Sequence, residues 1–403
     1  MLKRLRVQNV LSLRDTTITL SNPLVLVGPN GAGKSAIIKA LQLFSVTFRV
    51  PIQLQRRLLR LGTVDLDSVV WRRDDRLPLV FQAWFREQEA GVPDYELRIE
   101  KTGGNWRVVS EAIRMPGLTF DSHSGVFEFG TEYRGTIQWR APMHASLPCF
   151  VRPYEKDQVA LQTIRPLLEL AKLAGSTWRY RVAAGDIAAP TKLPPGVPPE
   201  QLHVRENGWG LAAVLRNLQG QDRATFDRIE RKLIEWFPYI RQINFEETGE
   251  GLRLAFSHSA GRAPIPAELE ADGVLHALFL IWRCYTARQE DRVCIEEPEN
   301  GTHPYLLAGR YEFIRKIAGG ELTQPPVRLV VTTQSPELLN AIGCDEALRV
   351  VQVVERHPEG GTSVHRLRDM DQVQRLCDVF KGQLGELWWS GAVGGVPANT
   401  DNI

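Results

Sequence analysis

The sequence has 403 residues, which is enough for one large domain or two to three ordinary ones. It is 43% hydrophobic and 24% charged, as is typical of soluble globular proteins, and no apolar run approaches the ~18 residues that cross a membrane. The formal net charge of +2 excludes a general electrostatic attraction to nucleic acid or acidic membranes. The five cysteines lack C-x-x-C spacing, and we predict reduced thiols in a cytoplasmic protein.

The first motif along the chain is a phosphate-binding loop. Its residues are Gly28, Pro29, Asn30, Gly31, Ala32, Gly33, Lys34 and Ser35, and they match G-x-x-x-x-G-K-[ST] at every fixed position. Alternating residues predict strands at 2–7 and 17–20, a buried strand at 24–27 and a helix over 34–44. In such a loop backbone N–H groups face the phosphates, the lysine reaches the β- and γ-phosphates, and the serine hydroxyl ligates Mg²⁺. We therefore expect a bound nucleoside triphosphate.

The pattern changes after the first helix. Residues 48–75 are rich in arginine, at positions Arg49, Arg56, Arg57, Arg60, Arg72 and Arg73. This segment is either a patch that contacts nucleic-acid phosphates or, as we favour, a solvated surface balanced by neighbouring aspartates. Residues 79–150 alternate between turn signals and predict an antiparallel sheet, residues 155–175 predict a helix, and the prolines of 190–199 predict a stiff connection.

The second half of the chain returns to α/β character. Helices are predicted at 210–218, 225–236 and 274–285, and short buried strands at 293–295 and 327–331. Each of these strands ends in polar residues, which is where an open α/β sheet places its chemistry.

Two adjacent acids, Glu296 and Glu297, follow the strand at 293–295. Because adjacent residues at a strand end point in different directions, the first can join the Mg²⁺ shell while the second orients and deprotonates the attacking water. Gln334 follows the next strand and is placed to contact the γ-phosphate. Asp272 and Gly273 stand at the start of an apolar helix, whose free N–H groups can meet a phosphate.

The order of these motifs resembles the ABC-type ATPase heads of the RecF/SMC/OLD group, often described only as AAA family ATPases. The matching segments are LRVQN at 5–9 (opening strand), GPNGAGKS at 28–35, EADG at 270–273 (signature), IEEPENGTHP at 295–304 (Walker B and D-loop) and TTQSP at 332–336 (switch). The segment Glu206-Asn207-Gly208 and the tail around Leu384–Trp388 resemble features of small stand-alone members. Roughly 80–200 matches only by its place as an insertion.

This resemblance implies an α/β fold, a P-loop NTPase head of the ABC type with an inserted antiparallel β and helical region. We expect the first part of the head at 1–78, the insertion at 79–200, the second part of the head at 201–355, and a tail at 356–403 that packs on the head or on a partner.

The resemblance also implies roles for the site residues. ATP and Mg²⁺ are the expected cofactors, with Ser35 and Glu296 holding the metal and Glu297 acting as general base. Lys34 and Gln334 contact phosphates. Such heads pair into a homodimer or higher homo-oligomer, so that Ala271, Asp272 and Gly273 reach the partner's nucleotide.

Three departures from the family pattern predict slow hydrolysis. Ala271 stands where the signature usually carries a serine, so one hydroxyl donor to the γ-phosphate is missing. Glu296 stands where many relatives have aspartate. Gln334 replaces a histidine and can donate a hydrogen bond but cannot carry a charge. We therefore expect a switch more than a motor.

The favoured function is a DNA-linked ATPase of bacterial anti-phage defence, with a nuclease or toxin partner in trans and DNA as a further candidate partner, but with no membrane contact. The segment after Ser335 is too short for a second catalytic domain. Trp388 and Trp389 either dock that partner or close the core. The alternative is a RecF-like repair ATPase. An ABC transporter subunit, a chromosome-structuring ATPase and a small-molecule kinase are disfavoured, the second because no long heptad arm is present.

Overall fold

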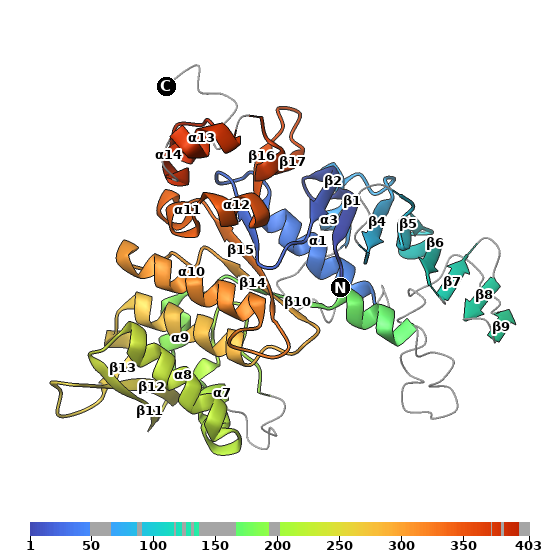
Figure 1. Ribbon diagram of the computed structural model, residues 1–403. Coiled ribbons are helices and arrows are strands. Elements are labelled where there is room, and N and C mark those ends of the chain that lie inside the picture. The colour runs from blue at the N-terminus through green and yellow to red at the C-terminus, as the bar shows by residue number, and fades with distance from the viewer. Residues whose placement is uncertain are drawn as a thin grey trace. The chain divides into compact units, whose positions relative to one another are not determined.

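The computed structural model describes residues 1–48, 66–86, 91–116, 118–122, 126–129, 133–136, 167–192, 202–371, 373–379 and 383–394. The chain divides into two compact units (Figure 1). Unit 1 comprises Met1–Thr177, Ala347–Val379 and Leu387–Ile403, and unit 2 comprises Trp178–Glu346 and Phe380–Glu386. The domain boundaries expected from the sequence stay a prediction.

Unit 1 contains the amino-terminal strands and the phosphate loop. Its first elements are β1 (Arg4–Val10), β2 (Leu13–Thr19), β3 (Leu24–Val27), α1 (Lys34–Thr47), α3 (Leu66–Val69), η1 (Trp71–Arg73), β4 (Leu79–Trp84), β5 (Tyr95–Thr102), β6 (Asn105–Met115), β7 (Leu118–Asp121), β8 (Val126–Phe129) and β9 (Tyr133–Thr136), and residues 167–174 are helical. Its later elements are β16 (Val351–Arg356), β17 (Thr362–Arg366), η5 (Leu367–Asp369) and α13 (Val373–Val379). Two short helices, α12 (Cys344–Val350) and α14 (Leu384–Trp389), lie at the boundaries of the units.

Unit 1 contains an eight-stranded antiparallel sheet, in the order β2-β1-β4-β5-β6-β7-β8-β9. Leu5 of β1 pairs with Ile18 of β2 on one side and with Ala83 of β4 on the other. Figure 1 shows β4 to β9 following one another away from β1. The antiparallel sheet predicted beyond residue 79 is therefore confirmed, and its strands extend the sheet that the first hairpin begins.

Aromatic side chains join α1 to this sheet. The ring centroid of Phe44 lies 5.0 Å from Phe48, 5.8 Å from Phe81 and 6.1 Å from Tyr95, and all four residues are fully buried. The buried hydroxyl of Tyr95 donates to Glu111 at 2.6 Å. Because an aromatic side chain buries 150–250 Å², this cluster fixes how the helix after the phosphate loop rests on the strands.

The strand β3, which leads directly into the phosphate loop, belongs to a smaller group of strands. In unit 1, β3 pairs in parallel with β16, with Val25 opposite Val351, and β16 pairs antiparallel with β17. All four residues of β3 are buried, as expected for a strand with neighbours covering both faces. The strand predicted at 24–27 and the helix predicted to follow the loop are confirmed.

Unit 2 contains the predicted acids, signature and switch. Its elements are β10 (Ser176–Tyr180, at the boundary), α6 (Ala184–Ala188), α7 (Leu211–Gln221), α8 (Arg223–Trp236), β11 (Ile240–Thr248), β12 (Gly251–His258), β13 (Ile265–Pro266), η4 (Ala267–Leu269), α9 (Asp272–Tyr285), β14 (Asp291–Glu296), α10 (Pro304–Gly319), β15 (Arg328–Thr333) and α11 (Pro336–Ile342). The strands β10, β14 and β15 are neighbours in that order, β14 and β15 are parallel, and β11 to β13 form a separate antiparallel sheet. The three helices predicted in this half are confirmed.

One buried cation ties three segments of unit 2 together. Arg310 of α10 is 2% exposed, and its two terminal nitrogens donate to the carbonyl oxygens of Pro298 at 2.8 Å and Gly273 at 2.7 Å. Burial lowers the pKa of Arg310 to about 10. The backbone after β14 and the first turn of α9 are thereby held on the same side chain.

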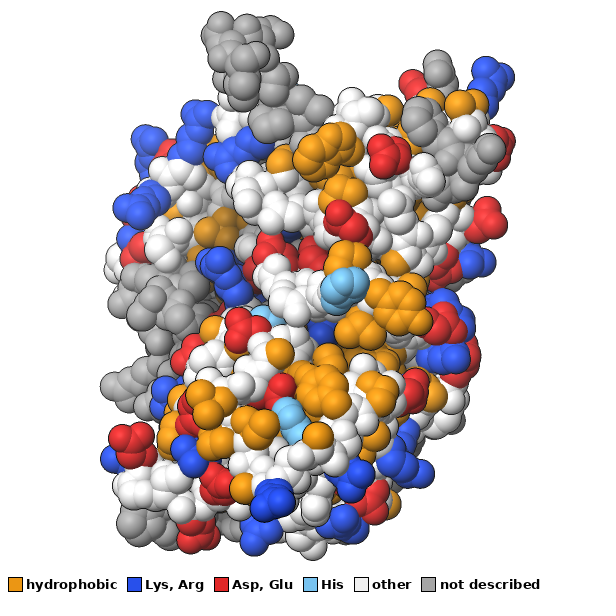
Figure 2. Space-filling view, turned by 90° about the vertical axis from the view of Figure 1, so that its left-hand side faces the viewer, with side chains coloured by type: hydrophobic (Ala, Val, Ile, Leu, Met, Phe, Trp, Pro, Cys, Tyr) orange, Lys and Arg blue, Asp and Glu red, His pale blue; other side chains and the backbone are white. Residues whose placement is uncertain are grey.

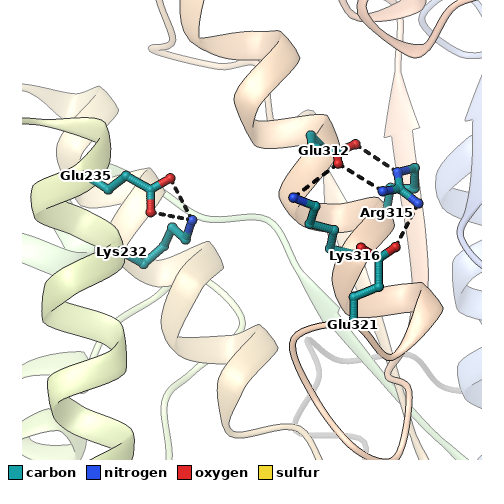
Figure 3. A network of polar contacts seen from close by, with 6 residues as sticks. All are labelled: Lys232, Glu235, Glu312, Arg315, Lys316 and Glu321. Atoms are coloured by element: carbon teal, nitrogen blue, oxygen red, sulfur yellow. Dashed lines mark hydrogen bonds and ion pairs between the residues drawn. The ribbon is translucent and has the colours of Figure 1, made fainter.

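The exposed face of the same helix carries a different kind of arginine. Arg315 lies between Glu312 at 2.8 Å and Glu321 at 2.9 Å, and Lys316 lies 3.4 Å from Glu312 (Figure 3). The hydrogen bond from Arg315 lowers the pKa of Glu312 to about 2. Water screens these groups, so their contribution to stability is small.

The cysteines differ in part from the prediction of reduced thiols. Cys284 and Cys294 are buried and free, but Cys344 and Cys377 are disulfide-bonded. The prediction is wrong for these two, because spacing along the chain does not show which sulfurs meet in the fold. The cysteine pattern thus no longer supports a reducing compartment. Within the part of the chain that the structure describes, every helix is too short or too polar to span a membrane.

We predict that Arg310→Met lowers the free energy of unfolding by about 2 kcal/mol or more, because two buried carbonyl groups lose their donors. Denaturation in urea, followed by tryptophan fluorescence, measures this change. Arg315→Met on the same helix is the matched control and should cost under about 1 kcal/mol. If the free energy of unfolding fell equally in the two variants, the buried contacts of Arg310 would contribute no more to stability than the exposed ones of Arg315.

We predict that Glu312→Gln costs at most about 1 kcal/mol at neutral pH, and that this loss is pH-dependent. The carboxylate has a lowered pKa in the folded state, so its contribution is present above its unfolded pKa and disappears as the pH falls from about 4.5 toward about 2. Unfolding curves of both proteins at pH 7 and pH 3 test this. If the two proteins differed more in their free energy of unfolding at pH 3 than at pH 7, the ion-pair explanation would be contradicted.

Candidate nucleotide site

The phosphate loop connects β3 to α1 through residues in left-handed conformations. Gly31 has φ of 79° and Gly33 has φ of 117°, values that side chains with a Cβ rarely adopt. Gly33 is the N-cap of α1, and the first turn of that helix carries no acidic residue. Asn30 and Gly31 are exposed at the tip of the loop. An uncapped helix start beside glycines in this conformation suits an anion.

Two glycines of the loop are required by their close neighbours. A Cβ on Gly28 would lie 2.3 Å from the carbonyl oxygen of Val354, and one on Gly33 would lie 2.1 Å from Oγ1 of Thr362. Both distances are too short for any side chain. The loop therefore runs directly against β16 and β17, and its path depends on those strands.

The predicted phosphate ligands lie at the first residues of α1. Lys34 is buried, and its amino group donates to the carbonyl oxygen of Gly28 and, at 3.1 Å, to that of Pro29. Ser35 is half-buried at the next position. The amide of Ala32 donates to Pro29 at 3.2 Å and closes a tight turn within the loop. The lysine thus points back along the loop, where the phosphates of a nucleotide would lie.

Sequence reasoning missed the residue that anchors the loop from outside. The buried hydroxyl of Thr362 lies 2.7 Å from Oγ of Ser12 and donates to the carbonyl oxygen of Ala32 at 2.9 Å. Arg356 donates to the carbonyl oxygen of Gly31 at 3.2 Å. These contacts come from residues more than three hundred positions away, and no local pattern in the sequence indicates them.

Glu296 is the last residue of β14, and its carboxylate is already in an ion pair. It accepts from Nε of Arg179 on the neighbouring strand β10, and Arg179 also lies 3.0 Å from Glu206. Burial opposes the charge of Arg179, but the hydrogen bond and charge of Glu296, with the charge of Glu206, hold the pKa of the guanidinium above its ordinary value. Because the three side chains are only partly exposed, removing one member leaves a poorly solvated charge without a partner. Sequence reasoning missed Arg179.

Glu297 has an unusual backbone conformation. Its φ is 50°, in the left-handed region that costs a residue other than glycine about 1–2 kcal/mol. The amide of Glu297 donates to Thr332 of β15 at 2.9 Å, and its carboxylate accepts from the side chain of Asn300 at 3.1 Å. The carboxylate of Glu296 thus pairs with Arg179, whereas that of Glu297 accepts from Asn300. Strain of this kind concentrates at functional positions.

The switch segment begins where β15 ends. The hydroxyl of Thr333 donates to Glu299 at 2.6 Å and accepts from the amide of Ser335 at 2.9 Å, while Gln334 between them is exposed. Burial raises the pKa of Glu299. Gln334 is therefore an exposed amide held between two anchored residues, a position that suits contact with a ligand.

The predicted signature lies at the first turn of α9. Ala271 is the N-cap and offers no side-chain acceptor, and Asp272 is the first residue of the helix. A Cβ on Gly273 would lie 2.3 Å from the carbonyl oxygen of Gly301. His276 contacts the carbonyl oxygen of Asn300 at 2.9 Å. The signature therefore packs directly against the D-loop, the segment that Arg310 also holds.

The residues present fit the expected cofactors by their chemistry. Mg²⁺ prefers oxygen ligands such as the Ser35 hydroxyl and the Glu296 carboxylate, and it usually keeps phosphate oxygens among its ligands. The lysine and the helix start of the loop suit those phosphates. The loop residues lie in unit 1, and Glu296, Glu297, Gln334 and the signature lie in unit 2.

The sequence left two interpretations open for the arginine-rich segment and for the two tryptophans near the end of the chain, and the structure describes part of both. Arg49, Arg56, Arg57 and Arg60 lie outside the described residues. In the described part Arg76 pairs with Asp74 at 2.8 Å, and Lys101 pairs with Asp67 at 2.9 Å. The tryptophans at the end of the chain differ, because Trp388 is 7% exposed and Trp389 is 79% exposed. One of the pair belongs to a core and the other faces solvent.

Two protein-family models match the chain. A model described as "AAA domain, putative AbiEii toxin, Type IV TA system" matches residues 150–340, and a model described as "AAA domain" matches residues 4–63. The second segment contains the phosphate loop, and the first contains the signature, the Walker B acids and the switch. No curated protein matches the sequence.

Solved structures are similar over most of the chain. One is the SMC head domain from Thermotoga maritima, with 14% identity, a TM-score of 0.38, and coverage of 91% of this chain and 98% of that one. Another is the Smc head domain with an extended coiled coil bound to the C-terminal domain of ScpA, from Pyrococcus furiosus, with 10% identity, a TM-score of 0.41, and coverage of 94% and 99%. Because both scores lie below 0.5, we take no inference from these two structures.

The segments that the two family models match hold every motif of the predicted head, from the phosphate loop to the switch. The chain is therefore similar to AAA-domain proteins over both segments, and this similarity supports the predicted resemblance to an ATPase head of the ABC type with a P-loop NTPase fold.

Proposed function

We propose that the chain binds ATP with Mg²⁺, hydrolyses it slowly, and works as a nucleotide-dependent dimerisation switch in a DNA-linked process. The observation that carries the proposal is the pair of residues at the end of β14. Glu296 and Glu297 are adjacent but have different partners, and the backbone of Glu297 is strained. Phosphoryl transfer to water uses one group to hold the metal and another to orient the nucleophile, and two adjacent carboxylates can divide these tasks.

The role of each residue follows from its chemistry. Lys34 and the amides of the phosphate loop neutralise the phosphates, and Ser35 and Glu296 hold Mg²⁺. Glu297 orients and deprotonates the attacking water, and Gln334 donates to the γ-phosphate. Most of this work is positioning and charge neutralisation, which is what phosphoryl transfer asks of a protein.

Slow turnover follows from two side chains. Ala271 has no hydroxyl to offer a phosphate, so one donor to the developing charge is missing. Gln334 can donate a hydrogen bond but brings no positive charge. Since a single donor to the transition state contributes about 10²–10³ in rate in well-studied enzymes, both features lower the turnover.

Exposed apolar residues beside the signature and the D-loop support pairing of heads. Leu269, two residues before Ala271, is 77% exposed, and Tyr305, next to the D-loop, is 85% exposed. Figure 2 faces the side of the molecule on which α10 lies in Figure 1, and it shows hydrophobic side chains gathered between charged ones. Exposed apolar side chains that gather into a patch are typical of surfaces that bind another protein.

We place this switch in bacterial anti-phage defence with an effector, a nuclease or a toxin, in trans. The family model that matches residues 150–340 is described with a putative AbiEii toxin of a type IV toxin–antitoxin system, which supports a role of this kind. The exposed indole of Trp389 is the side chain that we assign to effector docking, because aromatic residues anchor interfaces.

We predict that Lys34→Ala weakens ATP binding by about tenfold to a hundredfold, because a charge-assisted hydrogen bond to phosphate is lost. Glu297→Gln should bind ATP as wild type does and hydrolyse none. Titration with a fluorescent ATP analogue measures binding, and phosphate release measures turnover. The matched control is Lys39→Ala, on the same helix outside the loop. Wild-type turnover should fall well below the ~10 s⁻¹ typical of enzymes, and a rate of many per second would refute the slow-switch proposal.

We predict that ATP with Mg²⁺ raises the solution mass of Glu297→Gln, because bound ATP persists when the base is removed. Light scattering during size exclusion measures the mass with and without ATP. Adding Tyr305→Asp should abolish the rise without loss of ATP binding, whereas the control Val92→Asp, also at an exposed apolar residue, should leave it unchanged. A mass that ATP does not alter, in a protein that binds ATP, would contradict the dimerisation switch.

A further inference from the structure

Arg179 lies between two carboxylates inside unit 2. It pairs with Glu296 and with Glu206, and the side chains are 12%, 10% and 23% exposed, respectively. The group therefore holds one positive and two negative charges in a place with little water. Glu296 is the residue that we propose as a metal ligand, so the ion pair and the metal draw on the same carboxylate.

The segment that supplies Glu206 is fixed in place by its backbone. The carbonyl oxygens of Glu206 and Asn207 accept from the amides of Arg181 at 3.1 Å and Ala183 at 3.0 Å. Gly208 has φ of 98°, and a Cβ there would lie 2.7 Å from the side chain of Ile187. The segment Glu206–Gly208 thus runs beside the residues that follow β10, and it holds the Glu206 carboxylate next to Arg179.

We infer that Arg179 competes with Mg²⁺ for Glu296, and that Glu206 keeps Arg179 paired when Glu296 turns to the metal. This inference rests on the proposed function, since it takes Glu296 as a ligand of Mg²⁺ bound with ATP. It gives Arg179 and Glu206 a role in setting how much Mg²⁺ the protein needs.

The physical basis is the difficulty of burying an unpaired charge. A guanidinium and Mg²⁺ both bind carboxylate oxygen, and each disfavours the other at short range. If Arg179 had Glu296 as its sole carboxylate partner, the metal would leave a largely desolvated cation unpaired, and the exchange would be unfavourable. Glu206 removes that obstacle because it is a second carboxylate already in contact with the same guanidinium.

Arg179 and Glu206 therefore change the Mg²⁺ requirement in opposite directions. Arg179→Gln removes the competing cation and leaves two carboxylates to attract the metal, so less Mg²⁺ is needed. Glu206→Gln removes the alternative partner and binds Arg179 more firmly to Glu296, so more Mg²⁺ is needed. A role in stability alone would not give shifts of opposite sign.

The experiment is a Mg²⁺ titration of nucleotide binding. A fluorescent ATP analogue at fixed concentration is mixed with the full chain, and the Mg²⁺ concentration at half-maximal binding is measured. We expect this midpoint to fall about fivefold or more for Arg179→Gln and to rise by a similar factor for Glu206→Gln. Arg179→Lys, which keeps the charge, should stay nearer to wild type than Arg179→Gln does.

Arg315→Gln is the matched control. Arg315 also lies between two glutamates, but on the exposed surface of α10 (Figure 3). Its removal changes the protein's net charge as Arg179→Gln does, so the midpoint should not move. Thermal unfolding of each variant shows whether it is folded.

The outcomes separate the inference from the proposed function. Opposite shifts in the two variants support the exchange. Shifts in the same direction, or none, in proteins that bind the analogue overturn it and leave the ATPase proposal standing. A wild-type chain that binds no analogue at any Mg²⁺ concentration overturns both. If Arg179→Gln does not fold, Glu206→Gln alone decides, because a midpoint that falls or stays constant is contrary to the inference.

Discussion

The guanidinium of Arg310 lies among backbone carbonyl groups, and it holds together the two segments of unit 2 that we predict to be functional. Its two terminal nitrogens donate to Pro298, directly after the predicted Walker B acids, and to Gly273, in the predicted signature. A buried cation must keep its acceptors, so these two segments cannot move apart independently. The close approach of Gly273 to Gly301 adds a steric constraint to the same junction. In our proposed mechanism, the residues that reach the partner's nucleotide are thus tied to the residues that carry out hydrolysis.

Three arginines of unit 2 differ in the acceptor groups that they contact, and these acceptors determine what each arginine can do. Arg310 contacts carbonyl oxygens, which are fixed to the backbone, and so it has a permanent place. Arg179 contacts carboxylates, which are on side chains and can change partner. Arg315 also contacts carboxylates, but water surrounds it, so exchange there changes little. An ion pair is therefore suited to regulate metal binding when it is shielded from water and its acceptors are side-chain carboxylates that can change partner.

Local patterns predicted a large part of the fold and of the candidate site. The phosphate loop, α1 and the acids at the end of β14 depend on residues close together in the sequence, and all lie where the spacing placed them. Arg179 and Thr362 could not be predicted, because their roles depend on strand neighbours that only the fold brings together. The continuity of the sheet from β1 to β4 is likewise a long-range pairing. The conformation of Glu297 also escaped prediction, since glutamate carries no preference for a left-handed backbone.

The support of the phosphate loop by β16 and β17 has a consequence for how the protein is made. Thr362 contacts Ala32 across a separation of 330 residues, and Gly28 lies directly against Val354. The loop precedes the main segment of unit 2 in the chain, and β16 and β17 follow that segment. Long-range contacts of this kind form late, because a large loop of chain must first be closed. A nascent or truncated chain that ends before β16 would therefore lack the contacts that shape the phosphate loop, so that this loop takes its final form only after β16 and β17 have been made.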